Sequence, residues 1–130
     1  MARKILLVDD APEVVHAVSQ ILQVMGYEVI TANGTEVFTL LREHRPDLLL
    51  LDIWMSGCNG QKLCGQIKED DSLRRTPVLL FSAHWDIARL AEEACADGYI
   101  LKPFKIRDLL TNIATAIAQA QRIDEITTGG

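Results

Sequence analysis

The 130-residue chain lacks the features that mark membrane-spanning, secreted and nucleic-acid-binding proteins. No apolar run approaches the roughly 18 residues that a membrane-spanning helix needs, and the first residues lead directly into an apolar run without a signal-peptide core. Three cysteines without a repeated spacing favour reduced thiols over a disulfide framework. A net charge of -5 argues against direct nucleic-acid binding, which normally needs a basic face. We therefore expect a cytoplasmic protein that contacts neither nucleic acid nor a membrane.

What the chain does contain is an alternation of strand-like and helix-like patterns. Short apolar runs predict five strands, at Ile5–Val8, Tyr27–Ala32, Leu48–Leu51, Val78–Phe81 and Tyr99–Leu101. Apolar residues at helical spacing predict five helices, over residues 12–25, 37–44, 63–67, 85–94 and 106–117. Such alternation indicates an α/β fold, a doubly wound parallel sheet covered on both faces. Its domain would span residues 1–121, and residues 122–130, which lack a core pattern, would form a frayed tail or the start of a linker.

Polar residues stand where four of the predicted strands end. The leucine run at 48–51 predicts a central strand buried on both faces, and Asp52 follows it directly. The other strand ends carry the carboxylates Asp9 and Asp10, the hydroxyl of Ser82 and the amine of Lys102. Parallel strands end at the same edge of a sheet, and ligands of such sheets bind beyond that edge. These side chains are therefore expected to form one site.

A cluster of three carboxylates repels itself, by roughly 4 kcal/mol for each like-charged pair at 4 Å. A few carboxylates suit Mg²⁺, with Mn²⁺ as a possible substitute, whereas calcium needs more oxygens and zinc prefers His and Cys. Lys102 would neutralise a transferring phosphoryl group, the Ser82 hydroxyl would donate to it, and Asp52 would be the nucleophile that becomes an aspartyl phosphate. The chain has no glycine-rich nucleotide loop, so the phosphoryl group would arrive on another molecule.

Four motifs occur in order along the chain: Leu7–Asp10, Leu51–Ile53 followed by Gly57 and Gly60, Phe81–Ala83, and Tyr99–Phe104. With them, residues 3 to about 120 resemble the receiver domain of bacterial two-component response regulators, of the single-domain kind seen in chemotaxis. The resemblance implies a flavodoxin-like receiver fold, a five-stranded parallel sheet of order 2-1-3-4-5 with five helices. It also implies a signalling switch phosphorylated on Asp52 by a histidine kinase or phosphotransfer protein. We expect no enzymatic activity beyond magnesium-dependent self-phosphorylation and self-dephosphorylation.

The resemblance further implies roles for individual residues. Mg²⁺ would be held by Asp10 and Asp52, with Asp9 acting mostly through water and the Trp54 backbone carbonyl as a further ligand. Ser82 would move toward the phosphoryl group and Tyr99 would turn inward behind it. This would change the surface of the fourth helix, fifth strand and fifth helix, which would control a downstream effector protein. The Lys102–Pro103 peptide bond would be cis.

Four positions near the expected site deserve separate predictions. Ser56 stands where the family usually has proline, and Asn59 where an acid is common, and neither is expected to touch the phosphoryl site. Trp54 and His84 lie two residues beyond Asp52 and Ser82, where they would flank the path of the water that hydrolyses the phosphoryl group. We predict that Trp54 covers the acyl phosphate and prolongs its lifetime, whereas His84 has the weaker, opposite effect of positioning a water.

Two rival functions remain open from the sequence. A metal-dependent phosphatase with an aspartate nucleophile needs a second acid two residues later, where this chain has Trp54, so that reading is disfavoured. A phospho-independent scaffold receiver would typically lose an acid, the lysine or the hydroxyl, and this chain keeps all of them. We favour a single-domain regulator that binds another protein, as a monomer or a weak phosphorylation-dependent dimer. The alternative is a piece of a longer regulator or hybrid kinase.

Overall fold

A five-stranded parallel sheet forms the centre of the protein, in a computed structural model that describes the backbone of residues 2–129 and the side chains of residues 2–123. The strands follow the order β2-β1-β3-β6-β7, which is the predicted order 2-1-3-4-5 once a small separate hairpin, β4–β5, is set aside. Their bounds are β1 (Lys4–Val8), β2 (Glu28–Ala32), β3 (Leu48–Asp52), β6 (Val78–Ser82) and β7 (Gly98–Leu101). The prediction of a doubly wound, flavodoxin-like fold is confirmed.

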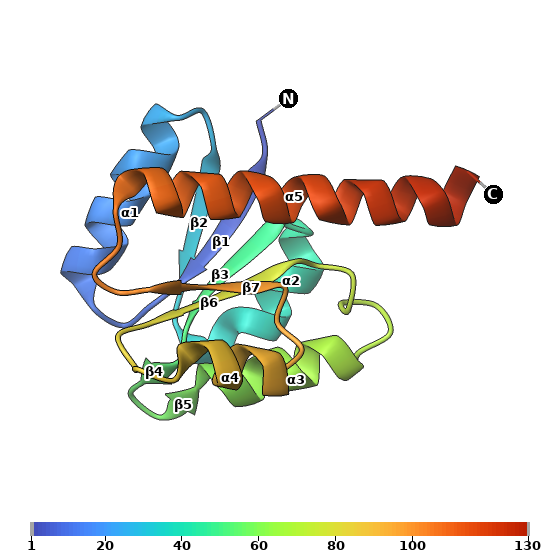
Figure 1. Ribbon diagram of the computed structural model, residues 1–130. Helices are drawn as coiled ribbons and strands as arrows, with labels where there is room; N and C mark the ends of the chain where they lie inside the picture. The colour runs from blue at the N-terminus through green and yellow to red at the C-terminus, as the bar shows by residue number, and fades with distance from the viewer. Residues whose placement is uncertain (1, 130) are drawn as a thin grey trace.

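Helices cover both faces of the sheet (Figure 1). They are α1 (Pro12–Val24), α2 (Val37–His44), α3 (Gly60–Glu69), α4 (Ile87–Glu93) and α5 (Ile106–Gly129), with a short 3-10 helix, η1 (Gly34–Glu36), before α2. Buried residues of α1 and α5 pack in one cluster on one face, and those of α2, α3 and α4 pack in another on the opposite face. Among the described residues, no helix is long and apolar enough to cross a membrane.

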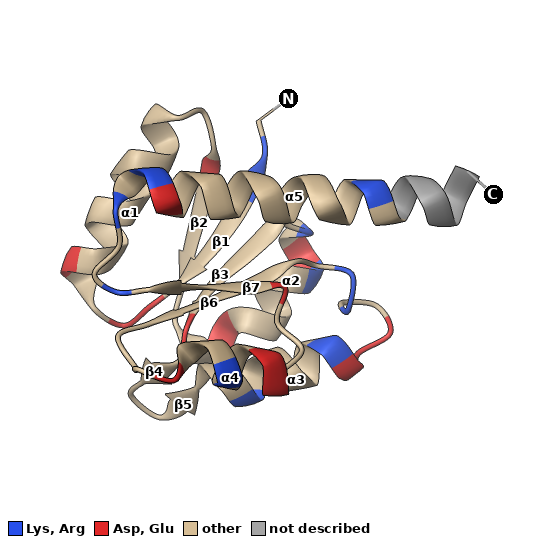
Figure 2. Cartoon of the chain, viewed as in Figure 1, with Lys and Arg blue, Asp and Glu red and all other residues tan. Residues whose placement is uncertain are grey.

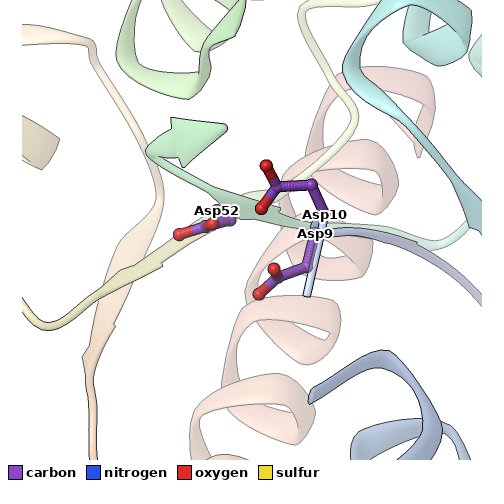
Figure 3. A group of neighbouring side chains, drawn as sticks. All are labelled: Asp9, Asp10 and Asp52. Carbon is purple, nitrogen blue, oxygen red and sulfur yellow. The ribbon is translucent and has the colours of Figure 1, made fainter. Parts of the chain in front are cut away.

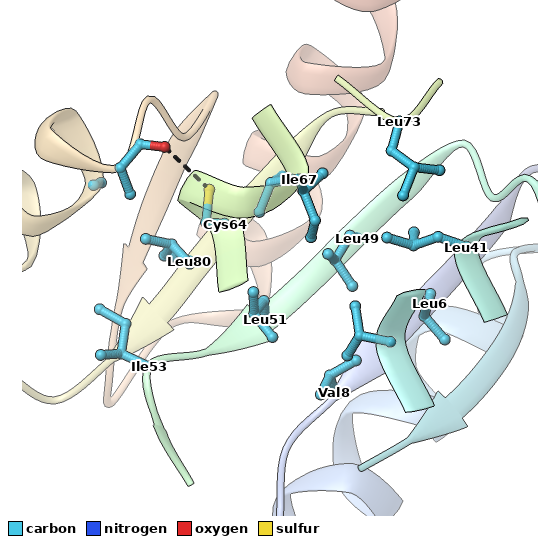
Figure 4. Packing of buried hydrophobic residues seen from close by; sticks show 14 of the residues in the cluster. Leu6, Val8, Leu41, Leu49, Leu51, Ile53, Cys64, Ile67, Leu73 and Leu80 are labelled. Atoms are coloured by element: carbon cyan, nitrogen blue, oxygen red, sulfur yellow. Dashed lines mark hydrogen bonds between the residues drawn. The ribbon is translucent and has the colours of Figure 1, made fainter. Parts of the chain in front are cut away.

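The leucine run of β3 is continuous because this strand is buried on both faces. Leu49 and Leu51 pack toward α2 and α3 with Cys64 and Ile67 (Figure 4), while Leu48 and Leu50 join the cluster of α1 and α5. All five residues of β3 and of β6 are buried, whereas the edge strand β2 has no fully buried residue. A strand with apolar contacts on both faces holds its last residue, Asp52, in a fixed place.

Three local features differ from the sequence predictions. The segment after Asp52, expected as a plain loop, forms a hairpin of β4 (Trp54–Met55) and β5 (Cys58–Asn59). Gly57, with a φ of 71°, makes the turn between them, a conformation that favours glycine. Helix α4 begins at Ile87, so the expected start at residue 85 is too early.

The third difference concerns the end of the chain. Helix α5 continues to Gly129, through the segment for which a frayed tail was predicted (Figure 1). The segment lacks a core pattern, yet it contains no glycine or proline before Gly129 that would end the helix. The backbone is thus helical where no regular structure was expected, while the tail or linker role of residues 122–130 and a domain boundary near residue 121 stay predictions.

Candidate functional site

Three carboxylates meet where β1 and β3 end (Figure 3). These strands are neighbours, with Val8 paired to Leu51, so the residues that follow them lie side by side. One oxygen from each of Asp9, Asp10 and Asp52 can be chosen so that all three lie within 4.8 Å of one another. Asp9 and Asp52 are buried and Asp10 is exposed. The predicted acidic cluster thus exists, with an opening to solvent on the side of Asp10.

Lys102, which directly follows β7, is the cation of this cluster. Its Nζ donates to Asp9 Oδ2 at 3.0 Å and lies 3.5 Å from Asp52 Oδ1. The amine also lies 4.4 Å from the centre of the Phe81 ring, a favourable cation–π position. The following peptide bond, Lys102–Pro103, is cis, as the resemblance implied. One lysine therefore faces three carboxylates.

This imbalance affects the protonation of Asp52. Burial raises the pKa of the Asp52 carboxyl to about 6; Lys102 opposes the rise, and the negative charges of Asp9 and Asp10 add to it. A bound cation would favour the ionised form and lower this pKa. The nucleophile expected at Asp52 is thus ionised at neutral pH.

The donor set fits a hard divalent cation. All three side chains offer carboxylate oxygens, the ligands that Mg²⁺ and Mn²⁺ accept, and no thiol or imidazole belongs to the cluster among the described residues. Asp9 is further oriented by the Ala11 amide, which donates to its Oδ1 at 2.9 Å. Asp9, Asp10 and Asp52 are therefore the side chains that could hold the metal, while the ligand role of the Trp54 carbonyl stays a prediction.

Ser82, the last residue of β6, lies on the strand next to Asp52. Asp52 is paired with Phe81, so Ser82 is one residue further toward the carboxyl end of the sheet. The residue is 2% exposed, and its Oγ accepts a hydrogen bond from the His84 amide at 3.1 Å. The structure thus brings together at one edge the acids, the lysine and the hydroxyl that the sequence predicted.

The position directly after the hairpin, Gly60, has no room for a side chain. A Cβ at this position would lie 2.0 Å from the Asp52 carbonyl oxygen, which no side chain can tolerate. Its amide donates to the Ile53 carbonyl at 2.7 Å, so α3 begins directly against the strand that carries Asp52. Asn59 caps this helix, since its Oδ1 accepts from the amides of Gln61 and Lys62 at 2.9 and 3.2 Å.

Ser56 was expected not to touch the phosphoryl site, which stays a prediction, but the structure joins its backbone to the acidic cluster. Its backbone amide donates to Asp10 Oδ2 at 2.8 Å. The hairpin, which the sequence analysis missed, turns the chain back toward the acids at this point. The available signal was the serine itself, because it supplies an N–H that the proline usual in the resembled family lacks.

An aromatic row lies beside the same strand ends. The rings of Trp54 and His84 are 6.0 Å apart, and those of His84 and Trp85 stack at 5.7 Å. The Asp86 amide donates to His84 Nδ1 at 3.0 Å, so a neutral His84 ring carries its proton on Nε2. Trp54 is 55% exposed, which leaves its shielding role a prediction.

Tyr99, the expected switch residue, lies on β7 with its side chain outward. It is 43% exposed and lines a hollow of about 550 Å³ with residues of β7, α5 and the segment between them, among them Phe104 and Asp108. Its inward turn on phosphorylation is a prediction that concerns another state of the protein.

Comparisons with known proteins identify relatives of this chain. A family model described as "Response regulator receiver domain" matches residues 5–114. The polar-differentiation response regulator DivK of Brucella anthropi is 32% identical over 124 residues, which cover 92% of this chain and 100% of DivK. The DNA-binding response regulator MtrA of Mycolicibacterium smegmatis is 33% identical over 116 residues, 87% of this chain and 50% of MtrA. The chain thus spans about half the length of MtrA and the whole of DivK.

Two solved structures have the same fold. A CheY-like response regulator receiver domain protein from Methanospirillum hungatei superposes with a TM-score of 0.84 and 26% identity, covering 94% of this chain and 98% of the other. NtrX from Brucella abortus superposes with a TM-score of 0.88 and 30% identity, covering 100% of this chain and 30% of NtrX.

Proposed function

The chain belongs to the response regulator receiver domain family, and from that premise we propose that it is a signalling switch that accepts a phosphoryl group on Asp52. One observation carries the proposal: three carboxylates lie together with a lysine that contacts two of them, and Ser82 ends the adjacent strand β6. A histidine kinase or phosphotransfer protein would be the donor, and a downstream effector protein would read the result.

In the proposed transfer, an Asp52 carboxylate oxygen forms the bond to phosphorus. The bond between phosphorus and the donor's ring nitrogen breaks, and its electron pair stays on that nitrogen. Asp9, Asp10 and Asp52 would hold Mg²⁺, which when bound supplies positive charge against the phosphoryl oxygens. Lys102 adds a second positive charge, and Ser82 donates its hydroxyl hydrogen to a phosphoryl oxygen.

The proposed output begins at Ser82. Its Oγ accepts the His84 amide, so movement of the hydroxyl toward a phosphoryl group changes the contacts of the loop before α4. Tyr99 would then turn into the space behind Ser82 and reshape the surface of α4, β7 and α5. The largely apolar hollow of about 420 Å³ between α1 and the segment after β7, lined by Val14, Lys102 and Phe104, supports docking of the donor close to the site. We place this exchange in the cytoplasm, with a monomer or a weak phosphorylation-dependent dimer as the working form.

Acetyl phosphate with Mg²⁺ tests the proposal, followed by intact-mass spectrometry. The wild-type protein should gain one phosphoryl group, and a chelator should prevent the gain. A phospho-independent scaffold would stay unmodified under both conditions. A phosphatase would instead release phosphate from p-nitrophenyl phosphate over many turnovers.

Replacing Lys102 by Ala separates accepting a phosphoryl group from responding to it. The variant should still bind Mg²⁺, because the three carboxylates remain. It should lose the coupling to the Tyr99 surface, because the positive partner of the phosphoryl oxygens is gone. Tyr99 fluorescence reports the coupling in a background without the other Trp and Tyr residues (Trp54→Phe, Trp85→Phe and Tyr27→Phe). A wild-type response to beryllofluoride in Lys102→Ala would remove Lys102 from the switch.

A further inference from the structure

The exposed carboxylate of the acidic cluster is held by a single backbone amide. Among the described residues, Ser56 is the one hydrogen-bond donor to the Asp10 side chain, at 2.8 Å. The other two acids have firmer restraints: Asp9 accepts from Ala11 and Lys102, and Asp52 is buried beside Lys102. Asp10 therefore depends on the hairpin for its orientation.

The charges around Asp10 do not hold its side chain in the cluster. Lys102 contacts Asp9 and Asp52, and no contact joins it to Asp10 in the described part of the chain. Repulsion from the two neighbouring carboxylates favours rotation of the Asp10 side chain outward, into solvent. The Ser56 amide opposes that rotation by binding one carboxylate oxygen, and it leaves the other oxygen available.

We propose that the Ser56 backbone amide is a positioning group for the metal, which orients the Asp10 carboxylate toward Asp9 and Asp52 and so raises the affinity for Mg²⁺. The inference rests on the proposed function of the same site and adds a residue that tunes it. Outer groups that orient a ligand contribute to affinity because the metal then does not have to order that ligand itself.

The geometry of the turn allows the amide hydrogen of Ser56 to be removed by a proline substitution. Ser56 directly precedes Gly57, whose φ of 71° suits the third position of a type II turn. Proline is common at the second position of such turns, so Ser56→Pro removes the N–H from a position that accepts proline. Ser56→Ala is the matched control, because it removes the hydroxyl and keeps the N–H.

The test is the Mg²⁺ dissociation constant of the unphosphorylated protein, measured by isothermal titration calorimetry with magnesium chloride. We expect Ser56→Ala to bind like the wild type and Ser56→Pro to bind about tenfold more weakly. A more rigid turn alone would strengthen binding, so weaker binding in the proline variant points to the lost N–H. Equal or tighter binding in Ser56→Pro would overturn the inference, since the amide would then be neutral or would compete with the metal.

A second measurement needs no variant and so does not depend on how Ser56→Pro folds. Coupling between two equilibria is reciprocal, so Mg²⁺ should stabilise the Ser56 hydrogen bond as much as that bond stabilises Mg²⁺. Hydrogen exchange of the Ser56 amide in the wild type should slow by about tenfold at saturating Mg²⁺. Unchanged exchange contradicts the inference.

The two proposals fail separately. If the wild type is phosphorylated by acetyl phosphate but neither measurement responds as stated, the positioning role of Ser56 is wrong and the switch function stands. If both measurements respond but no phosphoryl group is gained, the metal site stands and the phosphoacceptor role is wrong.

Discussion

The acidic residues at the two ends of the central sheet differ in how many donors and positive charges surround them. The acids directly before β3 and β7 have their own donors: Asp47 accepts the Lys4 amide at 2.7 Å, and Asp97 accepts the Lys68 amine and the Val78 amide, both at 2.7 Å. Where β1 and β3 end, three carboxylates lie beside one lysine, which contacts two of them. Figure 2 colours the acidic residues red along the chain, including those at the ends of β1 and β3.

The difference distinguishes a structural acid from a functional one. Asp47 and Asp97 accept hydrogen bonds from the first backbone amides of neighbouring strands, and so hold the starts of these strands in register. Their partners are groups of the protein itself. The acids at the other end are short of positive charge, and burial and neighbouring charges raise the pKa of Asp52 to about 6. By contrast, hydrogen bonds from Ser72 and the nearby Arg42 lower the pKa of Asp70 at the end of α3. Such a deficit of partners is expected of a site that binds a cation.

The largest expected effect comes from removing the nucleophile. Asp52→Asn should abolish phosphorylation by acetyl phosphate, because an amide cannot form the acyl phosphate. Intact-mass spectrometry gives the readout, and Asp97→Asn is the control from the other end of the sheet. A phosphorylated Asp52→Asn protein would show that another residue is the acceptor.

Acidification should weaken the functional end by protonating its ligands. The pKa of Asp52 is raised to about 6, so Mg²⁺ affinity should fall as the pH drops through that value, by about tenfold for each pH unit below it. Tryptophan fluorescence during Mg²⁺ titrations between pH 5 and 8 measures this. Affinity that stays constant down to pH 5 would mean that Asp52 is not a metal ligand.

At the structural end, removal of an acid should destabilise the fold. Asp97→Ala leaves the Val78 amide without its acceptor. It also removes the carboxylate that pairs with the largely buried Lys68 amine, which keeps the Arg74 and Thr76 carbonyls, so the loss should cost about 2 kcal/mol in the free energy of unfolding. Urea denaturation measures this cost, and Asp71→Ala is the control. Asp71 is almost fully exposed, and its ion pair with Arg74, at 3.8 Å, is long, so its removal should change stability little. Equal stability of the two variants would contradict the contrast between paired and surface acids.

A smaller effect is expected at the rim of the site. Trp54 lies two residues beyond Asp52 and faces His84, where we predict that it narrows the path of the hydrolytic water. Trp54→Asn should speed loss of the phosphoryl group several-fold, a change of roughly 1 kcal/mol in the barrier. Decay of the phosphorylated protein after removal of acetyl phosphate gives the rate, and Trp85→Asn is the control. Equal decay rates in Trp54→Asn and the wild type would remove the shielding role.

Much of the fold could be read from the sequence because its signals are local. The leucine run of β3, the apolar run of β6 and the polar residues that end them predicted the sheet and its functional edge. The family resemblance added the strand order, which apolar patterns alone do not determine. Asp9, Asp10, Asp52, Ser82 and Lys102 all lie at the predicted edge.

What could not be predicted depends on contacts between distant segments. The Ser56 amide meets Asp10 across 46 positions of sequence, and a two-residue strand pair such as β4–β5 is too short to have a pattern. The extension of α5 to Gly129 was missed because helix was expected only where apolar spacing continued.

The central claim is that the carboxyl end of the sheet is destabilised by its own charge until a cation binds. Because the folded-state pKa of Asp52 is raised from 3.8 to about 6, its contribution to stability is present at low pH and lost as the pH rises through about 6. At neutral pH without metal, Asp52→Asn should therefore have a free energy of unfolding about 1 kcal/mol higher than that of the wild type. Its melting temperature should be higher accordingly. Mg²⁺ should raise the melting temperature of the wild type and remove that advantage.

Thermal melts of both proteins at pH 7.5, in chelator and in Mg²⁺, test this claim most directly. The account predicts that Asp52→Asn is the more stable protein in chelator and that the order closes or reverses in Mg²⁺. A clear loss of stability of Asp52→Asn in chelator would contradict it, because Asp52 would then be a structural acid like Asp97.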